Sequence, residues 1–216
     1  VLTELNFTRY LYNSLVISLV TTAVSILVCI MSGYALARFN FRGAGLLSMG
    51  TVLIRMVPPV VVAVPMYVLW TKFGLTGGLS GLVLAYLGLT IPLNVWMLSI
   101  FIKEIPFELE EAAAIDGCSY MRILWGIVVP LIKPGISVTS VFTFRTAWNE
   151  FLLAIILSNR STRTLPAAVS LMISDLGINW GQIMAMATII AIPAFIVTFA
   201  CSKNLITGMT AGAVKG

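Results

Sequence analysis

The sequence predicts an all-α fold, a polytopic bundle of helices that cross a membrane. Hydrophobic residues make up 59% of the 216 positions and charged residues only 10%, whereas soluble domains carry about 25% charged residues. Five apolar stretches reach the length of about 20 residues that a helix needs to cross a bilayer. Lipid offers no partners for open backbone groups, and no stretch alternates as a barrel strand does, so all five are predicted to be helices.

The predicted spans form one domain over residues 1–216. They cover residues 14–37, 46–71, 79–102, 134–157 and 183–202. The first span carries no charge, the second contains Arg55 and the pair Pro58–Pro59, and the third and fifth contain Pro92 and Pro193. Proline is tolerated inside a span because neighbouring helices can satisfy the carbonyl groups that it frees.

Basic residues between the spans predict the orientation, because cytoplasmic connections carry an excess of Lys and Arg. If the connection after the first span is cytoplasmic, seven basic residues lie inside and four outside. The inside set is Arg38, Arg42, Lys103, Arg122, Lys133, Lys203 and Lys215, and the outside set is Arg9, Lys72, Arg160 and Arg163. This orientation places the C-terminus in the cytoplasm. A short amphipathic helix is expected on the outer face, around residues 165–176.

Composition also disfavours several classes of function. The chain has no histidine and only three widely spaced cysteines, which argues against a metal site, a histidine proton relay and histidine-based catalysis. No glycine-rich phosphate cradle of the GxxxxGK[ST] type is present, so ATP is not expected to bind here by that route. The net charge of +5 is scattered between the spans, which does not suggest nucleic acid. We therefore expect no catalysis, metal or cofactor in this chain.

The long cytoplasmic connection, residues 103–135, carries the most specific pattern. Pro106 is expected to open a helix with Glu108, Glu110 and Glu111 in its first turns, where acidic side chains complement the positive helix end. Three alanines then give a smooth surface, and Gly117 is expected to end the helix.

A second amphipathic helix is predicted over residues 120–129. Helical spacing puts Met121, Leu124, Trp125 and Val128 on one side. Two short helices around a glycine bend suit docking into a groove of a cytoplasmic partner. The alternative is a helix pair that only anchors to lipid headgroups.

These residues resemble a known family. Glu111-Ala112-Ala113, followed by Gly117, Ile127 and Pro130 at the family's spacing, is similar to the EAA loop of binding-protein-dependent importer permeases, with Val129 where the family has leucine. The resemblance implies that the loop contacts an ATPase subunit. The residues that it marks for this coupling are Glu108, Glu111, Ala112, Ala113, Asp116, Gly117, Ile127 and Pro130.

Three further segments resemble the carbohydrate branch of that family, the second permease subunit of maltose-type importers. They are residues 33–39, 148–151 and 210–216. The resemblance implies the type I permease fold of ABC importers, which usually has six spans, so one N-terminal span is expected to be missing here. It also implies a cytoplasmic tail, residues 204–216, that contacts the ATPase through Ala213, Lys215 and Gly216.

The same resemblance implies partners and a location. A second permease, two ATPase subunits that bind ATP and magnesium, and an extracytoplasmic solute-binding protein would assemble with this chain in the lipid of a bacterial inner membrane. Two alternatives stay open: a secondary transporter driven by an ion gradient, and a membrane scaffold or sensor that does not transport. The sequence does not identify the solute.

Polar residues inside the spans are candidates for a solute pathway, because such residues are rare in lipid. In the fourth predicted span Thr139, Thr143, Thr146 and Glu150 form one stripe, and Arg145 and Asn149 lie beside it. The candidate set is Arg55, Asn94, Thr143, Arg145, Thr146, Trp148, Asn149 and Glu150. Hydroxyl and amide groups suit the polar groups of a sugar, and the indole ring suits its C–H face. The alternative is packing between helices through threonine and paired charges.

Overall fold

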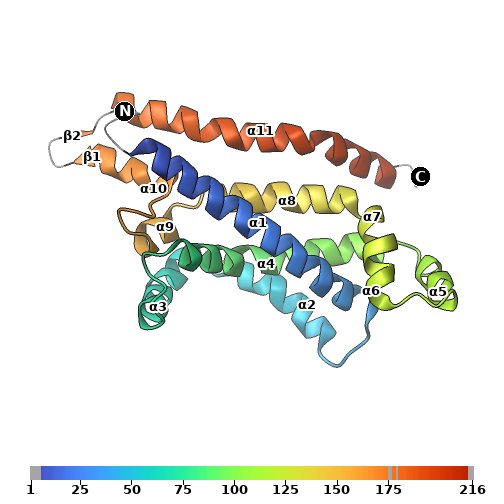
Figure 1. Cartoon of the computed structure of the whole chain (residues 1–216). Coiled ribbons are helices and arrows are strands. Elements are labelled where there is room, and N and C mark those ends of the chain that lie inside the picture. The colour runs from blue at the N-terminus through green and yellow to red at the C-terminus, as the bar shows by residue number, and fades with distance from the viewer. Residues whose placement is uncertain (1–5, 175–176, 179, 214–216) are drawn as a thin grey trace.

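Long helices that run in roughly one direction make up most of the computed structural model (Figure 1). The structure describes residues 6–174, 177–178 and 180–213. In chain order the elements are α1 (Phe7–Arg38), α2 (Ala44–Leu53), the 3-10 helix η1 (Ile54–Met56), α3 (Pro59–Lys72), α4 (Leu79–Lys103), α5 (Glu108–Ile115), α6 (Tyr120–Ile123), the π-helical turn η2 (Leu124–Val128), α7 (Val129–Leu131), α8 (Lys133–Trp148), α9 (Leu152–Leu157), α10 (Leu165–Ala168), the 3-10 helix η3 (Val169–Met172), the paired antiparallel strands β1 (Ile173–Ser174) and β2 (Gly177–Ile178), and α11 (Trp180–Ala213).

Three of the predicted spans are confirmed as single helices. In the described part of the chain, α1, α4 and α11 are long and apolar enough to cross a membrane, and two bent pairs raise the total to five if each pair is one span. The all-α architecture is thereby confirmed, apart from the two-residue strands β1 and β2.

The second predicted span is not one helix. The segments 44–56 and 59–72 meet at an angle of 99°. Val57 and Pro58 both have extended backbones, with ψ angles of 117° and 134°. A residue before proline is disfavoured in the helical region, and proline itself lacks an N–H for the helix ladder, so the Pro58–Pro59 pair breaks the run.

The fourth predicted span is also wrong in its extent. Helix α8 ends at Trp148, and the apolar residues after it form the separate helix α9. Both carboxylate oxygens of Glu150 accept backbone hydrogen bonds, from Leu153 N at 3.0 Å and from Ala154 N at 2.9 Å. These bonds satisfy the free N–H groups at the start of a new helix. Helix α8 instead continues backwards, across a bend of 79°, into segment 120–131.

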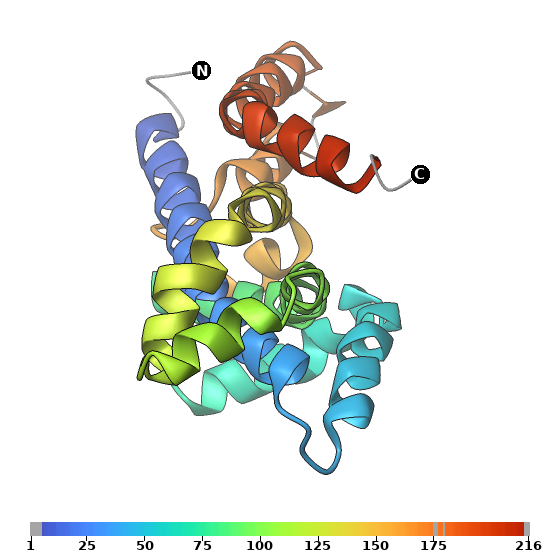
Figure 2. The same cartoon turned by 90° about the vertical axis from the view of Figure 1, so that its right-hand side faces the viewer.

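Helices α1, α4 and α8 form the centre of the bundle, and α11 lies along α8 (Figures 1 and 2). A Cβ atom on Gly33 of α1 would lie 3.3 Å from both Leu98 Cβ and Ser99 N of α4. The two helices therefore approach closely where a residue without a side chain allows it.

The short helix expected on the outer face is present but buried. Helix α10 has Leu165 and Ala167 fully shielded from solvent. The N-terminal turns of α1 hold this segment: Asn13 donates hydrogen bonds to the carbonyls of Ser161 and Arg163, both at 3.0 Å, and Leu165 N donates to Ser14 Oγ at 2.8 Å. The segment is thus part of the fold and does not lie free on the surface.

Candidate coupling surface and solute pathway

The loop that carries the EAA pattern projects from one end of the bundle (Figures 1 and 2). Helix α5 begins after Pro106, and Gly117, with φ at +81°, ends it. Gly117 N donates to Ala114 O and Cys118 N donates to Ala113 O, both at 3.0 Å. This pair of bonds is the Schellman motif, in which glycine supplies the left-handed residue. The predicted glycine bend is confirmed.

Most residues that the resemblance marks for coupling face solvent in this chain. Glu108, Glu111, Ala112, Asp116 and Gly117 are all exposed. Ile115 at the tip of α5 is 87% exposed, although it is large and apolar. An isolated helix end of this kind presents a small ridge that a partner could cover.

The three alanines do not share one surface, contrary to expectation. Ala112 and Ala114 are exposed, whereas Ala113 is buried in a core cluster with residues of α1, α4 and the second loop helix. A helix turns by about 100° per residue, so adjacent alanines cannot all face outward. Ala113 therefore anchors α5 to the bundle.

The predicted one-sided stripe of the second loop helix is wrong. Leu124 and Val128 are buried, with 2% and 0% exposure, but Met121 and Trp125 are 53% and 43% exposed. The π-helical turn η2 widens the local spacing, so the regular helical count does not apply through it. Ile127 packs partly buried at the edge of the core cluster, and Pro130 is exposed.

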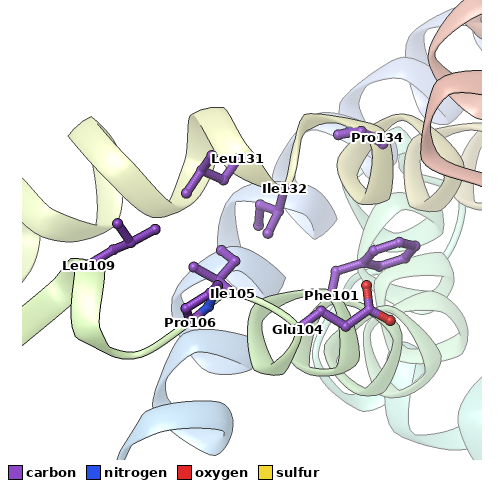
Figure 3. A pocket seen from close by; sticks show the side chains of 8 residues that line it. All are labelled: Phe101, Glu104, Ile105, Pro106, Leu109, Leu131, Ile132 and Pro134. Carbon is purple, nitrogen blue, oxygen red and sulfur yellow. The ribbon is translucent and has the colours of Figure 1, made fainter. Parts of the chain in front are cut away.

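An apolar recess of about 280 Å³ lies beside α5, where α4, α7 and α8 meet (Figure 3). Leu109 and Leu131 lie on one side of it, and Phe101 and Pro134 on the other. Glu104 is the only charged residue in its lining. The exposed end of α5 thus lies next to an apolar recess that is large enough for an apolar side chain of a partner protein.

Sequence reasoning missed the buried acid of this loop. Glu110, expected only to complement the helix end, is 4% exposed and pairs with Arg38 of α1. Tyr34 also donates to Glu110. The available signal was the four-residue spacing of Tyr34 and Arg38, which puts both on one face of α1.

Three candidate pathway residues lie inside the packed bundle. Asn94 of α4 donates to Ser25 Oγ of α1 at 2.8 Å and to Thr143 Oγ1 of α8 at 2.7 Å. Trp148 is 1% exposed, donates to Ile190 O at 2.9 Å and stacks on Phe144. These contacts match the packing alternative for Asn94, Thr143 and Trp148.

Other candidates are exposed or only partly buried in this chain. Arg145 and Asn149 are exposed. Thr146 is partly buried and donates to Phe142 O at 2.8 Å. Glu150, as described above, caps α9, so its charge serves the fold.

Arg55 lines a second cavity, of about 430 Å³, between η1, α3 and α4. Its guanidinium donates to Leu89 O at 3.0 Å. Pro59, Gly88 and Pro92 are among the other lining residues. A lone guanidinium in an otherwise apolar cavity is held in place by a backbone carbonyl, which leaves its other N–H groups for a ligand or water.

Among the described residues, no group of three or more His, Cys, Asp or Glu side chains could hold a metal ion. Helix α11 continues to Ala213, the last residue that the structure describes at this end. Lys215 and Gly216, the other predicted tail contacts, lie outside the described residues.

Comparison with known proteins decides the family. Residues 25–210 match the family model described as "Binding-protein-dependent transport system inner membrane component". The chain belongs to this family. It is similar to the sulfoquinovosyl glycerol permease of Agrobacterium fabrum, with 34% identity over 96% of this chain and 73% of that protein. The diacetylchitobiose permease of Streptomyces coelicolor is 32% identical over 98% of this chain and 77% of its own length.

Solved structures share the fold. The methionine ABC transporter MetNI, in an inward-facing conformation, matches with a TM-score of 0.75 at 17% identity, over 93% of this chain and 94% of that chain. A bacterial ABC transporter that imports the acidic polysaccharide alginate matches with a TM-score of 0.72 at 18% identity, over 100% of this chain and 77% of that one. The family match and the curated relatives show that this chain is an ABC importer permease subunit, a multi-pass protein of the inner membrane, as the sequence predicted. No observation favours the ion-gradient alternative.

Proposed function

We propose that this permease subunit forms half of the pathway for a carbohydrate and couples to an ATPase subunit through α5, Gly117 and the helix after it. One observation carries the coupling proposal: Glu111 and Ala112 of the EAA pattern stand exposed on a helix that projects from the end of the bundle, with the exposed Gly117 bend next to them. A helix face of this kind suits a groove on a partner.

The partners are those that membership of this family implies. ATP and magnesium would be bound by two ATPase subunits, and an external binding protein would deliver the solute. A second permease would complete the pathway. The exposed apolar residues on α3, such as Val60, Val61 and Val64, suit contact with lipid or with that subunit. The loop and the C-terminal tail would then lie in the cytoplasm.

A carbohydrate is the solute class that the relatives favour. The permeases similar to this chain include those named for sulfoquinovosyl glycerol, diacetylchitobiose and trehalose. Arg145, Asn149 and Arg55 are the accessible candidates for contacts with the solute. Amide and guanidinium groups can donate to sugar hydroxyls, and a guanidinium can pair with an acidic substituent.

The first test is purification of the chain in detergent, with mass identification of the proteins that co-purify. We expect a second permease and an ATPase. The complex is then placed in proteoliposomes with its binding protein, and uptake of labelled trehalose, maltose and diacetylchitobiose is measured with and without ATP. A chain that purifies alone, with uptake that follows an ion gradient and ignores ATP, would contradict the proposal. ATP-driven uptake of an amino acid but of none of the three sugars would contradict only the solute class.

A further inference from the structure

A buried polar network joins α5 to α1. Glu110 of α5 accepts from Arg38 Nε at 2.6 Å through one carboxylate oxygen and from Tyr34 OH at 2.8 Å through the other. Arg38 Nη2 also donates to Ile105 O at 2.9 Å, in the segment between α4 and α5. The side chains of Arg38 and Glu110 are only 9% and 4% exposed. Arg38 thus holds both α5 and the segment that leads into it.

Few other contacts fix α5. Its most extensive backbone contact with another helix is with α6, and the hydrogen bonds between α5 and α1 are made by side chains. Ala113 adds a small apolar contact, and the guanidinium of Arg38 lies 5.5 Å from the ring centre of Phe107, just before α5. The network around Glu110 is therefore the main polar attachment between α5 and the first span.

Burial of an ion pair is a poor way to gain stability, because well-packed apolar residues often serve as well. Hydrogen bonds to both oxygens of the Glu110 carboxylate do, however, fix how α5 is oriented against α1. Tyr34 and Arg38 lie one turn apart on α1, so Glu110 cannot move along or around α1 without breaking a bond. A displacement of α5 would then carry the end of α1 with it.

Helix α1 extends from this network to the opposite end of the molecule. Its 32 residues run from the loop held by Asn13 and Ser14 to Arg38. Midway, Ser25 accepts from Asn94 of α4. One continuous helix therefore joins the coupling end of the bundle to the buried α10 segment at the other end.

We propose that Tyr34, Arg38 and Glu110 are positioning residues that transmit movements of α5 to α1. This inference rests on the proposed coupling of α5 to an ATPase. In it, the exposed side of α5 receives the movement and the buried side passes it to the first span. Helix α4, which is joined to α5 directly by the chain, would respond by a separate route.

The test compares hydrogen–deuterium exchange in the assembled complex without nucleotide and with ADP and vanadate. Three segments are followed: residues 30–38 at the end of α1, 95–103 at the end of α4, and 108–116 in α5. The variants are Glu110→Gln, Arg38→Gln and Tyr34→Phe. The matched control is Arg42→Gln, since Arg42 is an exposed arginine four residues beyond Arg38.

In the parent and in Arg42→Gln, we expect nucleotide to change exchange in all three segments. In Glu110→Gln and Arg38→Gln, the change in residues 30–38 falls about fivefold or more, a usual size for lost coupling between sites, while 95–103 and 108–116 still respond. Solute carried per ATP hydrolysed falls in parallel, measured with whichever labelled disaccharide the parent transports. Tyr34→Phe, which keeps the ion pair, gives a smaller loss.

An unchanged response of residues 30–38 in Glu110→Gln, with the ATPase still bound, would overturn the inference. So would loss of the ATPase from all three variants but not from Arg42→Gln, because the network would then only keep the loop folded. Failure of the parent itself to bind an ATPase would be a different result, and would overturn the proposed function.

Discussion

Replacement of Gly117 tests the glycine bend most directly. Its φ of +81° is a left-handed conformation, and a Cβ atom there would meet nothing within 4 Å. The penalty for a side chain within this subunit is therefore that of the backbone alone, roughly 1–2 kcal/mol for an ordinary L-residue. That energy lowers the ratio of the native turn, with its left-handed residue 117, to an altered turn by a factor of about 5 to 30.

Three variants of Gly117 distinguish the effects of backbone conformation, side-chain size and charge on transport. Gly117→Ala should lower the ratio of native to altered turn by that factor and reduce ATP-driven uptake. Gly117→Asn should lose less, because asparagine tolerates the left-handed region. Gly117→Asp has nearly the shape of asparagine but adds a negative charge beside the exposed Asp116. We expect it to insert in the membrane and to stop transport.

The assay is uptake in proteoliposomes, with the amount of inserted subunit and of bound ATPase measured in the same preparation. Uptake by Gly117→Ala equal to that of the parent would refute the argument from positive φ. Equal loss in Gly117→Asn and Gly117→Asp would show that bulk at the partner's surface, and not charge, is decisive. Normal uptake by Gly117→Asp would contradict a role of the Gly117 bend in coupling.

Three further substitutions address the fold and the pathway. Glu150→Ala removes the cap of α9 and should destabilise the subunit by about 1 kcal/mol, seen as a lower melting temperature in detergent, with Glu150→Gln less affected. Asn94→Leu leaves the buried hydroxyls of Ser25 and Thr143 without their donor, which should cost about 1–3 kcal/mol; an unchanged melting temperature would contradict the packing role. Arg145→Ala, at an exposed site, should alter stability by no more than about 0.5 kcal/mol but raise the KM for uptake; an unchanged KM would remove it from the pathway.

Hydropathy located three of the five spans as single helices, because burial in lipid depends on composition over about 20 residues. The total reaches five only if each of two bent pairs is one span. Hydropathy could not predict their shape. Residues 46–71 read as one apolar run, yet the structure bends there by 99° between two helices. The Pro58–Pro59 pair was visible, but whether a proline kinks a span or ends it depends on which neighbouring helices satisfy the freed groups.

The polar stripe of the fourth span shows a different limit. Thr139 and Thr143 do share a face, which is buried against other helices. Glu150 was placed on the same stripe by assuming an unbroken helix, and the break after Trp148 moves it to the start of α9. Periodicity predicts a shared face only within one helix, and it does not say whether that face meets protein or solute.

The three glutamates of α5 show why the coupling loop could be predicted only in part. Glu108, Glu110 and Glu111 look alike in sequence, but only Glu110 faces inward, because Arg38 is its partner. That partner lies 72 residues away, so no local pattern could select it. The exposed Glu111 belongs to the EAA pattern and the buried Glu110 does not. Helix α5 thus has two sides: changes on the outer side should weaken ATPase binding, whereas changes at Glu110 should leave binding intact and weaken its effect on α1.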